Sequence, residues 1–196
     1  MMTMTANELC KIANEFANYT TCYLKGGIGK YLDQSWYDSL LRKYPDNSKY
    51  NNGKDGHYVN TDAFAFDCIC FIKSMLAGCT TKHHLKDYTE FNKCPIGDCT
   101  TKAFKEMLID QEKPSANTPC GYGLATDGHA GLSLGNGVWV DCNWNGKDQN
   151  GVMVHIGGIE RFDVAGKIPT IDYSEKKDEV QLFLEWLYKE WKGRKE

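Results

Sequence analysis

The sequence contains no run of five basic residues and no large excess of either charge. Lysine and arginine together number 23, aspartate and glutamate number 26, and the formal net charge is −3. Proteins that bind nucleic acids through the phosphate backbone present a strongly basic face. The charge pattern therefore argues against nucleic acid as a partner.

Long apolar segments are missing as well. No stretch reaches the ~18 consecutive apolar residues that are needed to span a bilayer. Residues 1–7 do not form the basic segment that precedes the apolar core of a signal peptide. We therefore expect no membrane insertion and no secretory signal.

The nine cysteines lack the spacing of a structural zinc site, because no two of them form a Cys-x-x-Cys pair. The nearest candidate is Cys94 with Cys99, close to His83 and His84. We therefore expect no metal and no cofactor. A chain of 196 residues can bury a core without disulfides, so we expect a reducing compartment and leave the cysteine pairing open.

The periodicity of apolar residues changes near Pro119, from helical spacing before it to strand-like alternation after it. The predicted helices are 5–19, 35–44, 64–78, roughly 100–110 and roughly 175–192, with a surface loop at 46–62. The predicted strands are 121–125, 129–134, 138–143, 151–156 and 169–173. This order indicates a single α+β domain, 1–196, in which N-terminal helices pack on an antiparallel sheet of about five strands and a helix closes the chain.

Capping residues mark where two of these helices begin. Thr5 with Glu8 forms a capping box, in which each side chain satisfies a backbone N–H of the other residue. Ser35 with Asp38 is expected to begin the second helix, which should end before Pro45 because proline disfavours a helical residue before it. These signals are local and predict helix starts without reference to the rest of the fold.

Cys68 follows Asp67, which is a typical N-cap for the apolar helix that ends near Gly78. A thiol in the first turn of a helix lies at the positive end of the helix dipole and near unpaired backbone N–H groups. Both favour the thiolate, which is the form that acts as a nucleophile. Cys68 is therefore a candidate nucleophile, and the alternative is a small core residue.

A Gly-Asn-Gly turn at 135–137 predicts a β-hairpin, and its loop length decides which side chains share a face. A two-residue loop would pair Gly135 with Val138 and place Asp141 on the face opposite His129. A three-residue loop would pair Leu134 with Val138. We expect the second register, because it gathers the apolar residues of both strands on one face.

In that register Asn143 lies opposite His129 and Asp141 lies diagonal to it. A carboxylate or amide in such a position can hold an imidazole in one tautomer and orientation. With Cys68 this gives the residue types of a thiol nucleophile with an oriented base. The spacing makes contact between Cys68 and His129 plausible without establishing it.

These motifs resemble the NlpC/p60 group of papain-like cysteine peptidases, which cut bacterial cell-wall peptides, and phage-encoded members most closely. Residues 66–72 read Phe-Asp-Cys-Ile-Cys-Phe-Ile, where the family has Phe-Asp-Cys-Ser-Gly and two apolar residues. Residues 129–137 match the histidine motif His-x-Gly-apolar-x-apolar-Gly-Asn-Gly, and Asp141 stands twelve positions after the histidine. Residues 23–27 match the upstream Tyr-x-x-Gly-Gly, and 168–173 resemble the closing strand of phage members.

The resemblance implies a role for each matched residue. Cys68 would attack an amide carbonyl, and His129 would take and return the proton. Asp141 would orient His129, with Asn143 as the alternative third residue. The Cys68 N–H and the Tyr23 hydroxyl would donate to the oxyanion.

Other residues near the motifs have two explanations each. Asp67 and Trp139 are candidates for contact with substrate. A helix cap is the favoured explanation for Asp67, and core packing explains Trp139 as well as substrate contact does. Ile69 and Cys70 depart from the family's Ser-Gly, which leaves substrate specificity open. His155 falls on a predicted strand and is expected to be structural.

The resemblance implies a peptidoglycan hydrolase, a cysteine endopeptidase that cleaves stem or cross-bridge peptides as a phage endolysin or tail lysin. It would stay in the cytoplasm until it is released or delivered in a virion, and would act at the cell wall on peptidoglycan peptides. An N-acetylmuramoyl-L-alanine amidase uses the same chemistry on the same fold. A non-catalytic phage wall-binding or structural module, or a hydrolase of another small amide, are further alternatives. The oligomeric state stays open.

Overall fold

A computed structural model describes residues 3–50, 58–144 and 150–174. The predicted C-terminal helix at 175–192 lies outside the described residues. The structure is mixed α+β, as predicted. Its helices are α1 (Ala6–Ala17), α2 (Gln34–Lys43), α3 (Asn47–Tyr50), α4 (Cys68–Leu76), α5 (Tyr88–Phe91), α6 (Thr101–Met107) and the 3-10 turn η1 (Ile159–Arg161). The expected sheet of about five strands is replaced by two sheets, of three and of six strands.

The first two helices begin at polar caps, one of them at a residue that was not predicted. Thr5 and Glu8 form the expected capping box at the start of α1. At α2 the cap is Asp33 rather than Ser35 with Asp38, because the Asp33 carboxylate accepts the N–H of Trp36 at 2.8 Å. Helix α2 ends at Lys43, before the proline, as predicted.

The small sheet contains β1 (Thr21–Tyr23), β2 (Ile28–Tyr31) and β3 (Phe64–Phe66), in the order β1-β3-β2. The predicted helix at 64–78 is therefore wrong in its first residues, which form β3 and run parallel to β1. Gly27 lies against this strand so closely that a Cβ would come within 2.7 Å of the β3 backbone. The chain then turns at Asp67 into α4.

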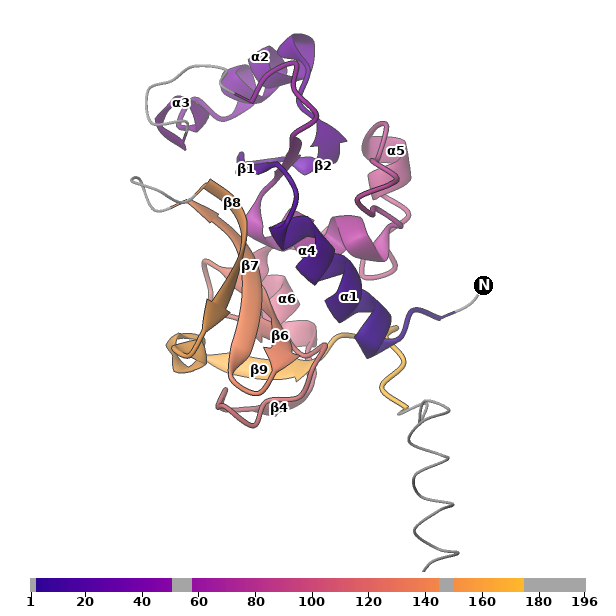
Figure 1. The fold of residues 1–196 in the computed structure, drawn as a ribbon, viewed down its shortest axis with the longest axis vertical. Coiled ribbons are helices and arrows are strands. Elements are labelled where there is room, and N and C mark those ends of the chain that lie inside the picture. The colour runs from indigo at the N-terminus through magenta and orange to yellow at the C-terminus, as the bar shows by residue number, and fades with distance from the viewer. Residues whose placement is uncertain (1–2, 51–57, 145–149, 175–196) are drawn as a thin grey trace, which may run out of the picture.

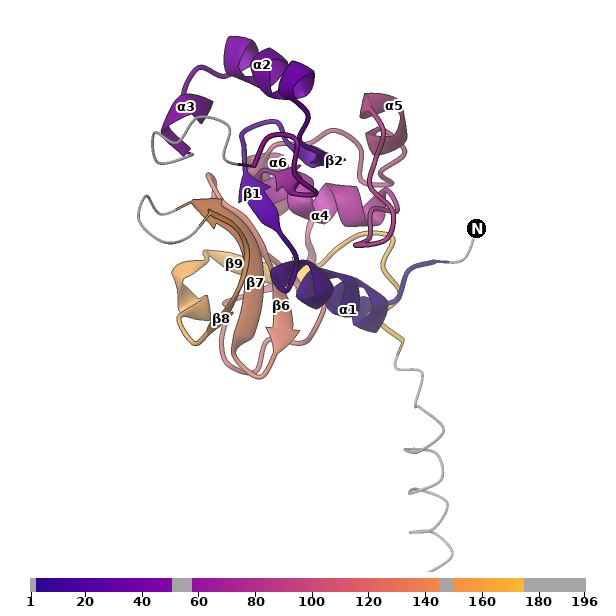
Figure 2. The same ribbon diagram turned by 45° about the horizontal axis from the view of Figure 1, so that its top comes forward.

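Helix α4 is the central helix of the molecule, and the expected N-cap Asp67 and stop near Gly78 are both confirmed. Every side chain from Cys68 to Met75 is buried. Helices α1 and α4 contact each other and pack against β6 (Ala130–Gly135) and β7 (Val138–Trp144) of the large sheet, while β1 of the small sheet contacts β7 and β8 (Asn150–Ile156) directly (Figures 1 and 2). The main core forms there, and includes Phe16, Phe66, Phe71, Leu132 and Val140.

The large sheet is antiparallel throughout, in the order β4-β9-β5-β6-β7-β8. Its strands are β4 (Ile109–Glu112), β5 (Gly123–Ala125), β6 (Ala130–Gly135), β7 (Val138–Trp144), β8 (Asn150–Ile156) and β9 (Val164–Lys167). The strand predicted at 169–173 is wrong, because these residues form a turn and a single bridge from Asp172 to Thr5. Strand β9 takes its place, and β4 begins where the helix near 100–110 was expected to end.

The hairpin of β6 and β7 combines the two predicted registers. Asn136 and Gly137 form a two-residue turn with positive φ, so that Gly135 pairs with Val138, and the expected Leu134–Val138 pair is wrong. An irregularity between Ser133 and Gly135 then shifts the ladder by one residue. Beyond it Leu132 faces Val140 and Gly131 faces Asp141, as in the predicted register. The bulge thus places Asp141 on the same face as His129 in spite of the short turn.

Two further features bear on the predictions. A disulfide joins Cys10 in α1 to Cys120, and the other seven cysteines are free. Within the described ranges, no helix has the length and apolar character to cross a bilayer.

Candidate active site

Asp67 shapes the start of α4 with both of its carboxylate oxygens. Oδ1 accepts the N–H of Cys70 at 2.7 Å, and Oδ2 accepts the N–H of Gly26 at 3.0 Å. The first contact caps the helix, and the second fixes the glycine turn between β1 and β2 against it. Asp67 therefore holds the frame around the adjacent Cys68, and its contacts agree with the helix-cap interpretation.

Cys68 occupies the first position of α4, with 6% of its surface exposed. Burial, followed by the nearby charge of Asp67, raises the pKa of its thiol to about 12, although the N–H groups of Ala130 and Ile69 act in the opposite direction. The expected preference for the thiolate is therefore wrong in the folded protein, since loss of solvation outweighs the helix terminus. For Cys68 to act as a nucleophile, a base would have to take its proton.

The structure brings Cys68 to the beginning of β6. The N–H of Ala130, the residue after His129, donates a hydrogen bond to the Cys68 sulfur. The ladder between β6 and β7 has its first partners one residue later, at Gly131 and Asp141. The Cys68 sulfur thus lies at the first residue of β6. Cys68 and Ala130, which are 62 positions apart in the sequence, meet there.

His129 is oriented by Asp141, which is the predicted third residue. Nε2 of His129 lies 2.6 Å from Oδ2 of Asp141, whose side chain is fully buried. Burial alone would raise the pKa of Asp141, but hydrogen bonds and charge from His129 and His155 hold it below its usual value. The ionised carboxylate can only accept hydrogen bonds, so Nε2 of His129 carries a proton and Nδ1 remains available as a base.

Asn143, the alternative partner, does not contact His129 by a hydrogen bond. Its side-chain oxygen accepts the N–H of Trp144 at 2.7 Å. The predicted register is nevertheless correct at this point, because continuing the ladder from Gly131 and Asp141 places Asn143 across from His129. The structure therefore assigns the orienting position to Asp141.

His155, expected to be purely structural, is the site residue that sequence reasoning missed. Its Nε2 lies 2.9 Å from Oδ1 of Asp141, so the carboxylate bridges two imidazoles. The alternation of β8 was visible in the sequence, but the register of β8 against β7 was not. That register pairs Asp141 with Met153 and leaves His155 diagonal to the carboxylate.

Trp139 is buried beneath the site, where it packs against His155, and does not line the site's surface. Only 2% of it is exposed, and its indole N–H donates to the Gly157 carbonyl at 2.9 Å. Its ring stacks on His155 at 3.9 Å and meets Phe162 edge to face at 5.0 Å. The expected contact with substrate is therefore replaced by core packing.

Tyr23, the last residue of β1, lies close to Cys68 and Asp67. Burial, and then the proximity of these two groups, raises the pKa of its hydroxyl, so the group keeps its proton and can donate it in a hydrogen bond. The Tyr23 ring meets Tyr50 at 5.1 Å, and Tyr50 meets Trp144 at 5.1 Å. These three rings form a continuous aromatic wall.

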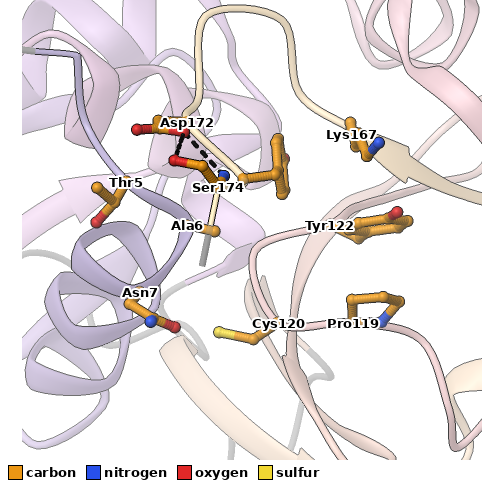
Figure 3. Close-up of a pocket in the computed structure, with 10 residues that line it drawn as sticks. Thr5, Ala6, Asn7, Pro119, Cys120, Tyr122, Lys167, Asp172 and Ser174 are labelled. Carbon is orange, nitrogen blue, oxygen red and sulfur yellow. Dashed lines mark hydrogen bonds between the residues drawn. The ribbon is translucent and has the colours of Figure 1, made fainter. Parts of the chain in front are cut away.

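A cavity of about 390 Å³ lies away from these residues, between the start of α1, the segment that precedes β5 and the end of β9 (Figure 3). Its lining residues are Thr5, Ala6, Asn7, Pro119, Cys120, Tyr122, Lys167, Asp172, Tyr173 and Ser174. It contains neither the candidate nucleophile nor either histidine. No group of three potential metal ligands has a binding arrangement within the described ranges.

No family model, no curated protein and no solved structure matches this chain. What the chain can do is therefore judged from the chemistry of the site. That chemistry comprises a protonated thiol at a helix start, an imidazole with a free nitrogen, and a buried carboxylate that fixes the imidazole.

Proposed function

We propose that this chain is a cysteine hydrolase of papain-like fold, of the NlpC/p60 type, which cleaves amide bonds in bacterial peptidoglycan. The proposal is carried by the hydrogen bond between His129 and Asp141, together with the Cys68 sulfur that accepts the N–H of Ala130, the residue after His129. A helix that presents a thiol to an antiparallel sheet bearing the base and its orienter supports the papain-like assignment. Peptidoglycan as substrate rests on the motif resemblance at 23–27, 66–72 and 129–137.

The geometry supports a two-step hydrolysis. Nδ1 of His129 takes the Cys68 proton as the sulfur attacks the amide carbonyl, because burial leaves the thiol protonated. The Cys68 N–H lies in the first turn of α4 and, with the Tyr23 hydroxyl, supplies donors for the oxyanion. His129 returns the proton to the leaving amine, and water then releases the acyl group from the thioester by the same sequence.

The aromatic wall of Tyr23, Tyr50 and Trp144 gives the substrate a surface beside the nucleophile. Asn150 braces this wall, since its side-chain oxygen accepts the Tyr23 N–H at 2.5 Å and its amide donates to the Tyr50 carbonyl at 3.0 Å. Such a surface suits a peptide that packs against rings and exposes its carbonyl to Cys68. The cleaved bond is a peptide bond in the stem or cross-bridge, or the bond between muramic acid and L-alanine.

The test is digestion of peptidoglycan from several Gram-positive walls by the wild-type protein and by Cys68→Ala, with mass spectrometry of the soluble products. Cys99→Ala is the matched control, because Cys99 is a free and partly exposed thiol outside the site. We expect fragments from the wild type and from Cys99→Ala, and none from Cys68→Ala. The fragment masses identify the bond. Equal release by Cys68→Ala would remove Cys68 as the nucleophile, and no release by any variant would favour a binding module.

A further inference from the structure

His155 has no role in the hydrolysis described above, yet it contacts one of the two carboxylate oxygens of Asp141. The two oxygens are divided between two imidazoles, with His129 on Oδ2 at 2.6 Å and His155 on Oδ1 at 2.9 Å. Because the carboxylate is fully buried, each of its oxygens depends on protein donors. The state of Asp141 therefore depends on His155 as much as on His129.

The protonation state of Asp141 decides which nitrogen of His129 can act as a base. An ionised carboxylate accepts a proton-bearing Nε2 and leaves Nδ1 free for the Cys68 proton. A protonated carboxyl group would donate to Nε2, and the ring proton would then reside on Nδ1. Burial with a single partner favours this protonated form, whereas a second donor on Oδ1 opposes it.

The orientation of His155 is fixed by the layer beneath it. Its ring lies nearly parallel to the indole of Trp139, with centroids 3.9 Å apart and an interplanar angle of 16°. Trp139 is anchored through its N–H to Gly157 and covered by the guanidinium of Arg161 at 5.4 Å. The stack therefore directs Nε2 of His155 at Asp141 and leaves it little freedom to turn away.

We propose that His155 is a positioning residue for the thiol reaction. By donating to Oδ1 it keeps Asp141 an acceptor, so that Asp141 holds His129 in the tautomer that receives the Cys68 proton. This inference rests on the proposed function, since it assigns His155 a part in activating the same nucleophile. The site is then a line of four side chains, Cys68 from α4, His129 from the residue before β6, Asp141 from β7 and His155 from β8.

The test measures the rate at which iodoacetamide alkylates Cys68 between pH 5 and 10, resolved from the other thiols by mass spectrometry. In His155→Phe the ring still stacks on Trp139 but the donor is lost. We expect the rate near neutral pH to fall on the order of tenfold or more, as for other partners that orient a functional histidine. The reaction should also shift toward alkaline pH, because burial raises the pKa of the Cys68 thiol and His129 is no longer held in the tautomer that receives its proton.

Two further variants separate positioning from packing. His155→Gln retains an N–H donor of similar reach and should recover most of the neutral-pH rate, whereas the shorter His155→Asn should not. The matched control is His83→Phe, which makes the same change at an exposed histidine outside the site and should react like the wild type. If His155→Phe does not fold, the difference between Gln and Asn decides the question.

The inference is overturned if Cys68 in folded His155→Phe keeps the wild-type pH profile, or if Gln and Asn behave alike. Failure of the proposed function looks different. In that case wild-type Cys68 would react near neutral pH no faster than the free Cys99 of the same molecule, before any substitution is made.

Discussion

Two carboxylates flank the nucleophile, and they are held in opposite ways. Asp67, at the start of α4, accepts two backbone N–H groups, and burial still raises its pKa above the ordinary value of 3.8. Asp141, on β7, has a fully buried side chain, and its pKa is nevertheless lowered because two imidazoles donate to it. The depth of burial therefore does not decide the charge of these groups.

The difference teaches which kind of partner keeps a buried carboxylate ionised. Neutral backbone N–H groups donate hydrogen bonds to Asp67 but supply no positive charge. Loss of solvation therefore determines the direction of its pKa shift, which is upward. Imidazoles donate hydrogen bonds and can also carry the compensating charge at Asp141. The first arrangement suits a residue that builds a frame, and the second suits a residue that must act as an anion on its neighbour.

The largest expected effect comes from Asp141→Asn. An amide in this position can donate to Nε2 of His129 and select the tautomer with the proton on Nδ1. We expect the rate of peptidoglycan cleavage to fall by roughly 10³ to 10⁴, the loss that follows when an orienting carboxylate becomes an amide. Single-turnover assays with the fragments released by the wild type measure it. A loss below tenfold would show that Asp141 does not set the tautomer.

A smaller effect, on stability instead of chemistry, is expected for Asp67→Ala. Loss of the N-cap should lower the free energy of unfolding by about 1 kcal/mol, within the usual range of about 0.5 to 2 kcal/mol for such caps. Urea denaturation followed by circular dichroism gives the value. Asp67→Asn keeps an acceptor for the Cys70 N–H and should lose less. Equal losses in both variants would show that the cap does not account for the stability.

The smallest expected effect is the dependence of stability on pH. Asp67 has a raised pKa in the folded protein, so its contribution is fully present below pH 3.8 and is lost as the pH rises through the folded value. Asp141 has a lowered pKa, so its contribution is present above 3.8 and is lost as the pH falls through the folded value. Unfolding curves of Asp67→Asn and Asp141→Asn against the wild type should therefore diverge with opposite slopes. Parallel curves would contradict the comparison.

Local signals in the sequence predicted the parts of the fold that depend on neighbouring residues. The capping box at Thr5, the cap at Asp67 and the strands around the hairpin follow from side chains a few positions apart. The same signals failed at α2, where the N-cap is Asp33, two residues before the predicted cap at Ser35. They also failed at β3 and β9, where pairing with distant strands overrides local preference.

The part of the candidate site that the β6–β7 hairpin positions was predictable from the sequence. Asp141 lies on β7 and His129 directly precedes β6, the other strand of the same hairpin, so one register argument brought them together. His155 was not predictable in the same way, because its strand pairs with β7 across a longer connection that gives no register. The pKa of Cys68 was misjudged for a related reason, since the sequence shows the helix start but not the depth at which it is buried.

The central claim is that His129, held by Asp141, activates Cys68. The most direct measurement is the rate of Cys68 alkylation by iodoacetamide at neutral pH in the wild type and in His129→Ala, with the Cys99 rate as the reference within each sample. We predict that Cys68 reacts faster than Cys99 in the wild type and loses that advantage in His129→Ala, where the buried thiol keeps its proton. Equal Cys68 rates in the two proteins would contradict the account.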